Sequence, residues 1–167
     1  MTLAAVTNTP WALLDDCKDA LEAAVIEGAR VFPQVVRATA EWQPPESQYR
    51  GETPIAVLRQ TATHQYDLPD DVYGGLLTVE LSVVTQIAAG VDQHESVQEC
   101  LRLIAAAKNA IESDPPDDAV AMGGPDIEFH HAIEWGDETP MDALEPPWVG
   151  FAIPLELSYK LDTSTSH

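Results

Sequence analysis

The chain has 167 residues and a mass of 18.1 kDa, which fits one domain of ordinary size. Hydrophobic residues make up 45% of it and charged residues 22%, a balance typical of a globular protein rather than a disordered one. Eight basic residues against 28 acidic ones give a formal charge of −20 at pH 7. This charge argues against general binding to DNA or to an anionic membrane, because such binding depends on Lys and Arg side chains.

The first residues contain no basic segment followed by an apolar stretch, and nowhere do about 18 apolar residues follow one another. We therefore expect no signal peptide and no membrane span, and a protein made in the cytoplasm. The two cysteines, Cys17 and Cys100, fall in predicted helices, on or beside an apolar stripe. This placement predicts two buried free thiols rather than a disulfide.

The first predicted helix runs from Thr9 to about Glu27. Thr9 followed by Pro10 is a typical helix start, because the hydroxyl caps free N–H groups and a proline at the first position loses none. Apolar residues then recur at spacings of three and four, which places them on one face, and Gly28 suits the end. The members of this stripe are Leu14, Cys17, Leu21 and Val25.

The second predicted helix begins at Asp92, which forms a plausible capping box with Glu95. It ends near Ser113, since Pro115 and Pro116 cannot continue it. Its expected buried stripe consists of Val97, Leu101, Ile104 and Ile111.

Five segments alternate by two between apolar and polar residues, the period of a strand with one buried face. They cover residues 36–42, 54–60, 76–87, 126–135 and 149–161. The order of elements predicts an α+β fold, with one mostly antiparallel sheet of about five strands covered by two amphipathic helices. We expect residues 1–161 to form a single domain and residues 162–167 a short disordered tail.

Pro154 interrupts the last and longest of these strands. Because proline cannot donate a ladder hydrogen bond, this strand is expected to be an edge strand or to be bulged at Pro154. As an edge strand, it would offer Phe151, Ile153, Pro154 and Leu155 to a neighbouring subunit.

Four connections are unusually long, and long connections are often functional. They span residues 43–53, 61–75, 114–125 and 136–147 and hold many of the acidic residues. We expect some of these acids to line a channel or loop surface. The candidates are Asp70, Asp71, Asp114, Asp117 and Asp118.

No motif for catalysis is present: the chain has no glycine-rich phosphate loop with a lysine and no serine in a Gly-x-Ser-x-Gly context. The most metal-like cluster is His130 and His131 with Glu128 and Glu134. In a strand, however, adjacent side chains face opposite sides, so His131 belongs to the apolar face and His130 to the polar one. We therefore predict no catalytic residue, no metal and no cofactor.

The excess of acid admits three interpretations. The first is a solvated surface, or adaptation to a salty interior, which the presence of only three lysines favours. The second is a cation site, but no Asp-x-Asp-x-Asp-Gly loop occurs. The third is a surface that lets DNA pass without holding it, because like charge repels phosphate.

The order and pattern of these elements over Ala12–Leu161 resemble the tail terminator proteins of long-tailed bacteriophages, also called minor tail or tail completion proteins. The resemblance lies in the first helix, the strand at Thr53–Val57, the strand at Leu76–Ile87, the second helix and the final strand. The run Gly150-Phe151-Ala152-Ile153-Pro154-Leu155-Glu156-Leu157-Ser158-Tyr159 is its most suggestive part. The predicted connections at 61–75 and 136–147 are longer than those of the shortest family members.

The resemblance implies an α+β subunit without catalytic activity that forms a hexameric ring. Such a ring caps the tail tube, ends its polymerisation and joins the tail to the head–tail connector, and DNA passes through its channel without specific binding. Its expected partners are copies of itself, the tail tube protein and the connector protein, and its expected location is the tail or neck of a virion assembled in the host cytoplasm. Two alternatives stay open: another neck or tube component of the particle, or a small cytoplasmic enzyme or ligand-binding domain of a salt-adapted organism.

Overall fold

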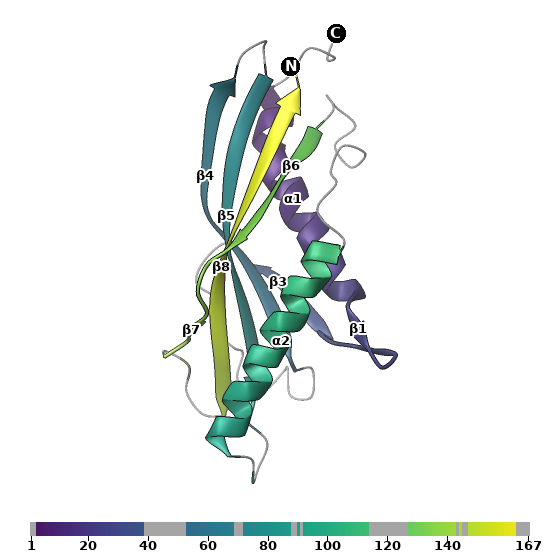
Figure 1. The fold of residues 1–167 in the computed structure, drawn as a ribbon, viewed down its shortest axis with the longest axis vertical. Helices are drawn as coiled ribbons and strands as arrows, with labels where there is room; N and C mark the ends of the chain where they lie inside the picture. The colour runs from purple at the N-terminus through teal and green to yellow at the C-terminus, as the bar shows by residue number, and fades with distance from the viewer. Residues whose placement is uncertain are drawn as a thin grey trace.

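The computed structural model describes residues 3–38, 53–68, 72–87, 90, 92–113, 127–142, 144 and 147–162. Two long helices and a mostly antiparallel sheet confirm the predicted α+β class. In chain order the elements in Figure 1 are α1 (Leu3–Ala23), β1 (Val25–Ile26), β2 (Ala29–Arg30), β3 (Gln34–Ala38), β4 (Ile55–Leu68), β5 (Val72–Gln86), α2 (Gln93–Ser113), β6 (Ile127–Trp135), β7 (Thr139–Pro140) and β8 (Trp148–Asp162).

The main sheet has the strand order β3-β4-β5-β8-β6, and β7 lies beside β8. The pairs β4–β5, β5–β8, β6–β8 and β7–β8 are antiparallel, whereas β3 runs parallel to β4. A second, two-stranded sheet consists of β1 and β2. The sequence pattern predicts neither the parallel pair nor the small second sheet.

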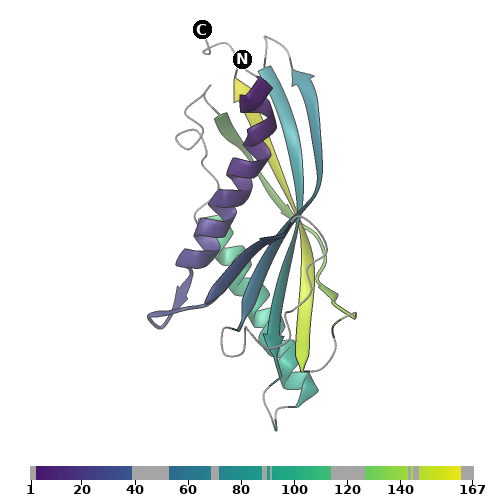
Figure 2. The ribbon, with the colours of Figure 1, turned by 180° about the vertical axis from the view of Figure 1, so that it is seen from behind.

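The core forms on one face of the main sheet, where α1 and α2 lie on the same side of it (Figures 1 and 2). Alternate residues of β5 and β8 point into this core and are fully buried, as the alternation predicts. They are Leu77, Val79, Leu81 and Val83 on β5 and Ile153, Leu155 and Leu157 on β8.

Each helix contributes one buried stripe to this core. On α1 the stripe includes Leu14, Cys17 and Leu21, as predicted, together with Leu13. On α2 the predicted Ile104 and Ile111 are buried, but Leu101 is 39% exposed, and Cys100, Leu103 and Ala107 occupy the face that contacts the sheet. The α2 stripe is therefore rotated from the predicted one, toward the face that contains Cys100, Leu103 and Ala107.

The start of α2 agrees with the sequence. The N–H of His94 donates to Oδ1 of Asp92 at 3.0 Å, so Asp92 is the N-cap, and the helix ends at Ser113.

The bounds of α1 differ from the prediction at both ends. The helix begins at Leu3 instead of Thr9, because the preceding turn contains Leu and Ala residues of high helix propensity, and Pro10 lies inside it without an N–H for the carbonyl of Val6. It ends at Ala23, and Val25 belongs to β1. Glu27 (φ 52°) and Gly28 (φ 81°) form the two-residue turn between β1 and β2. Positive φ angles at both central residues are typical of the tight turns that join antiparallel strands.

Two of the predicted connections contain strand. Most of the segment 61–75 belongs to β4 and β5, which pair as far as Leu68 and Val72. The alternation fails there because a bulge between Gln60 and Ala62 adds a residue, Thr61, whose hydroxyl donates to the carbonyl of Thr78 at 3.1 Å. The segment 136–147 contains β7.

Candidate functional site

The predicted edge strand is an interior strand. β8 has β5 on one side and β6 and β7 on the other, so Phe151, Ile153, Pro154 and Leu155 are not a free edge for a neighbouring subunit. Ile153 and Leu155 are fully buried and Phe151 packs against the core. The edge interpretation was wrong because it treated the missing N–H of Pro154 as requiring an open side, whereas a break in the neighbouring strand also accommodates it.

The break lies directly beside Pro154. β6 ends at Trp135 opposite Leu155, and β7 begins at Thr139 opposite Ala152. The N–H of Gly136 donates to the carbonyl of Pro154 at 2.8 Å, on the side where the proline has no donor of its own. A β-carbon at Gly136 would lie 2.4 Å from Cγ of Pro154, so only glycine fits against the ring.

The predicted acidic channel residues, Asp70, Asp71, Asp114, Asp117 and Asp118, lie outside the described residues. His130 and His131 lie on β6, but the structure does not describe their side chains. Among the side chains that are described, no three His, Cys, Asp or Glu residues form a group that could hold a metal ion.

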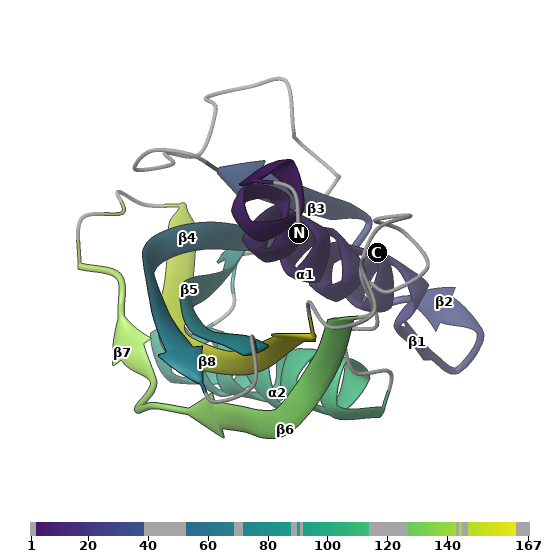
Figure 3. The same ribbon diagram turned by 90° about the horizontal axis from the view of Figure 1, so that it is seen from above.

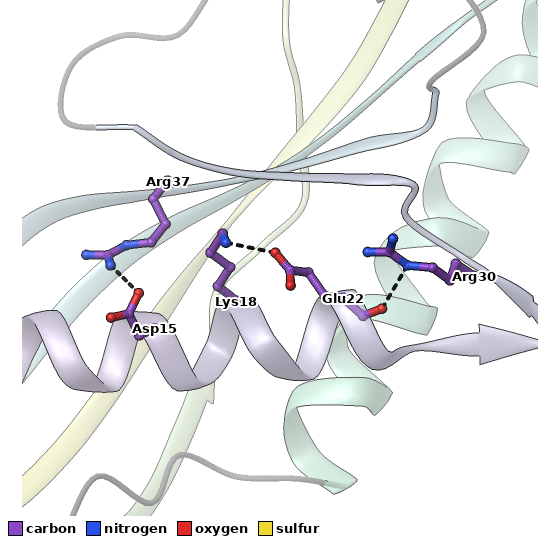
Figure 4. A network of polar contacts seen from close by, with 5 residues as sticks. All are labelled: Asp15, Lys18, Glu22, Arg30 and Arg37. Carbon is purple, nitrogen blue, oxygen red and sulfur yellow. Dashed lines mark hydrogen bonds and ion pairs between the residues drawn. The ribbon is translucent and has the colours of Figure 1, made fainter. Parts of the chain in front are cut away.

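The margins of the described sheet are β3 on one side and β6 with β7 on the other. β3 is fixed to the first helix by an ion pair between Arg37 and Asp15, seen in Figure 4. Each margin strand pairs on one side with a neighbour from this chain, and within the described residues no strand pairs with its other side. Unpaired backbone groups at such margins are ready to pair with another chain.

The sheet face opposite the helices is apolar and buried at one end, where it contains Ile55, Val57 and Val84. Farther along the strands it is polar. Arg59 of β4 binds Glu80 of β5 at 2.9 Å, with both side chains about one-third exposed. On the neighbouring strands Glu134 lies opposite Glu156. Because like charges directly opposite each other destabilise a sheet, this pair of glutamates does not stabilise the fold.

A concave apolar surface lies on the helical side of the molecule, between the end of α1, strand β1 and the C-terminal half of α2. We call it the helix groove, and it encloses about 330 Å³. None of its ten lining residues carries an ionisable side chain, although the chain as a whole has 28 acids. The small residues Ala20, Ala23, Ala106 and Ala110 lie along its two helical walls.

The β1–β2 hairpin, residues 25–30, borders this groove and projects away from the rest of the fold (Figures 1 and 3). We call it the arm. Val25 is 61% exposed and Ile26 is 42% exposed, and with Leu101 they are the large hydrophobic residues that the described surface exposes. Two strands of two residues each are too short to be stable alone.

Polar contacts hold the base of the arm on α1, as Figure 4 shows. Nε of Arg30 donates to the carbonyl of Glu22 at 3.1 Å, which is one of the carbonyls left without a partner at the end of a helix. The N–H of Val31, just after the arm, donates to the carbonyl of Ala24 at 2.9 Å. Within α1 itself, Lys18 binds the carboxylate of Glu22 at 2.8 Å. The arm therefore has a fixed base and an apolar strand that is partly exposed among the described residues.

Both cysteines are buried free thiols, as predicted. Burial raises the pKa of Cys17 to about 12, and the nearby Asp16 carboxylate adds to the rise. Burial, with a contribution from Glu99, also raises the pKa of Cys100 to about 11. Because the thiolate is the reactive form, neither cysteine is suited to nucleophilic chemistry at neutral pH.

Comparison with known proteins adds little to this description. No protein-family model matches the sequence, and no curated protein matches it. Of the solved structures that match, one is 18% identical, with 97% of this chain and 96% of that chain covered and a TM-score of 0.34. A likeness this weak carries no argument. Neither described helix has the length and apolar character needed to cross a membrane.

Proposed function

We propose that this protein is a structural, non-enzymatic subunit of a phage tail that assembles with copies of itself into a ring at the end of the tail tube. In this role the ring ends polymerisation of the tube and joins the tail to the head–tail connector. The proposal starts from the sequence resemblance to tail terminator proteins, and the α+β fold is compatible with it.

The observation that carries the proposal is the pair of sheet margins that no described strand covers, together with the exposed apolar residues of the arm. A protein that acts alone normally protects its edge strands and buries large apolar side chains. Here the described surface keeps β3 and β6 as margins and leaves Val25 and Ile26 exposed. These features favour a subunit that is completed by neighbours.

Charge determines the conditions under which such a ring forms. Each copy carries a formal charge of −20, so copies repel one another until salt screens them. The screening length falls from ~30 Å at 0.01 M ionic strength to ~3 Å at 1 M. Assembly should therefore strengthen as salt is added, and the same negative charge would let DNA pass through the ring without being held.

Electron microscopy of the purified protein at 0.05 M and 1 M NaCl, with mass measurement under the same conditions, tests this function. Short closed rings of uniform mass that become more abundant at high salt, and that bind the end of purified tail tubes, are the expected result. Extended tubes would assign the chain to the tube instead. A monomer at every salt concentration that also ignores tail tubes would overturn the proposal.

A further inference from the structure

We infer that His130 and His131, in strand β6, form the centre of a binding site for a divalent transition-metal ion, with Zn²⁺ as the test case. The inference does not depend on the function proposed above. It starts from the backbone register of β6, which departs from that of a regular strand at these two residues.

The two histidines are an insertion in the ladder between β6 and β8. The pairing is regular up to Phe129 and resumes at Ala132, but the partners of these two residues are consecutive on β8. Regular alternation separates His130 and His131 onto opposite faces, and the prediction of no metal rests on it. Because residues in a bulge lie outside the ladder and depart from the extended backbone, alternation does not separate this pair.

The position of the insertion also favours a site. Bulges are frequent at sheet edges and next to functional sites, where they redirect side chains. β6 is a margin of the main sheet (Figure 1), and within the described residues no strand pairs with its outer side. Because two residues are inserted, alternation continues unchanged beyond them, and Ile133 and Trp135 pack against the helical core. The insertion therefore keeps the apolar pattern of the sheet and places two histidines at its margin.

The residue types at the insertion determine the class of ion. Imidazole nitrogen is a preferred ligand of Zn²⁺, Cu²⁺ and Ni²⁺, whereas Mg²⁺ and Ca²⁺ take oxygen ligands. The formal charge of −20 also attracts cations to the surface of this chain. Two adjacent histidines on an acidic protein therefore suit a transition metal better than an alkaline-earth ion.

A carboxylate of the same strand is available as a third ligand. Glu134 follows the insertion, is exposed, and lies opposite Glu156 of β8. Like charges directly opposite each other destabilise a sheet, and a cation bound near them would relieve the repulsion. Glu128, before the insertion, lies opposite Lys160, which is itself a cation. We therefore assign Glu134 to the site rather than Glu128.

Calorimetric titration of the full chain with Zn²⁺, after removal of metals with a chelator and without a histidine tag, tests the site. His130→Ala and His131→Ala should each weaken Zn²⁺ binding at least about tenfold, since losing even an outer partner of a metal ligand typically costs ~10–100-fold. His94→Ala is the matched control, because His94 is also exposed beside carboxylates but lies on α2, and it should leave the affinity unchanged. Glu134→Gln should weaken binding more than Glu128→Gln, and the reverse order would overturn the assignment of Glu134.

Two further measurements do not depend on single substitutions. Deletion of both histidines leaves a ladder with the same residues on each face, so this variant should keep the wild-type circular dichroism spectrum and lose Zn²⁺ binding. Cu²⁺ bound to the wild type should show coupling to imidazole nitrogen in its electron paramagnetic resonance spectrum.

The inference is wrong if the wild type does not bind Zn²⁺. It is also wrong if binding persists in the deletion variant or if the Cu²⁺ spectrum lacks nitrogen coupling, because the ion would then be held by carboxylates of a chain that has 28 acids. If His94→Ala weakens binding as much as His131→Ala does, the metal binds at α2 and not at the insertion.

Discussion

The two faces of the main sheet are built on different principles. The face that α1 and α2 cover consists of Leu, Ile and Val side chains with no exposed surface, such as Leu81 and Leu155. The opposite face has a buried apolar end, with Ile55, Val57 and Val84. The rest of it has a partly exposed Arg59–Glu80 ion pair and two glutamates, Glu134 and Glu156, opposite each other. Burial of apolar surface is the dominant stabilising effect in folding, whereas exposed ion pairs contribute little. The covered face therefore provides most of the stability.

On the face opposite the helices, Gly136 makes a close steric contact with the ring of Pro154. It lies where β6 ends and the chain leaves toward β7, and it depends on steric fit instead of burial. At the same end of the sheet, Gly150 packs against Met141 and Leu144, so the segment after β7 covers part of this face. Substitutions should therefore be costly over the whole helical face, but on the other face only at its buried apolar end and at local contacts.

The largest effect is expected from Leu81→Ala. Leu81 is fully buried in the helical core, and its truncation removes apolar contacts and leaves a cavity, so the free energy of unfolding should fall by about 2–5 kcal/mol. Urea unfolding followed by circular dichroism measures it. The control is Thr78→Ala on the opposite face of the same strand, which should cost less than ~0.5 kcal/mol. Equal costs for both substitutions would contradict the comparison of the two faces.

Gly136→Ala should have the next largest effect, and it lies on the polar face. The added β-carbon meets Cγ of Pro154 at 2.4 Å, so the strand must shift, at a cost of about 1–3 kcal/mol. Replacing the ring in the double variant with Pro154→Ala should remove most of that cost. A double-mutant cycle by urea unfolding measures the coupling between the two positions, and additive effects would show that the ring is not the cause.

Because both thiols are buried, we expect the free energy of unfolding to fall at alkaline pH. The pKa of Cys17 is raised to about 12 and that of Cys100 to about 11 in the folded chain, whereas an unfolded thiol ionises near ~8.5. Stability from these groups is complete below that value and is lost as pH rises, by up to about 1.4 kcal/mol per pH unit for each thiol. Urea unfolding between pH 8 and 10.5 should show a shallower decline for Cys17→Ala than for the wild type. Parallel declines would argue against a buried, neutral Cys17.

Sequence periodicity predicted the elements that have one buried face and one exposed face, and those whose ends have a clear local signal. The alternation in β5 and β8 and the capping of α2 by Asp92 are such cases. It did not predict the arm, because Val25 continues the three-and-four spacing of α1 while its β-branched side chain and the following Glu27–Gly28 turn favour a strand. It also missed the extension of β4, whose residues beyond Gln60 have little apolar contrast between the two faces.

The candidate site was harder to predict than the fold. Pro154 shows that a donor is missing from a strand, but the position of the break in the neighbouring strand depends on the pairing of β6 and β7 with β8, which is tertiary. The helix groove likewise joins residues of α1 and α2 that are 83 to 93 positions apart. A local signal for the β1–β2 hairpin was present in the sequence: Val25 and Ile26 are β-branched and precede a turn with glycine.

The smallest effect is expected from the Arg59–Glu80 pair, which tests how little the polar face contributes. Both side chains are about one-third exposed, so exchanging Glu80 for Gln should lower the free energy of unfolding by less than ~0.5 kcal/mol in 0.1 M salt and by still less in 1 M salt. Arg59→Gln alone and the double variant complete a double-mutant cycle measured by urea unfolding at both salt concentrations. A coupling above ~1.5 kcal/mol that persists in 1 M salt would mean that the pair is shielded from solvent, and the polar face would then contribute to stability in the same way as the face under the helices.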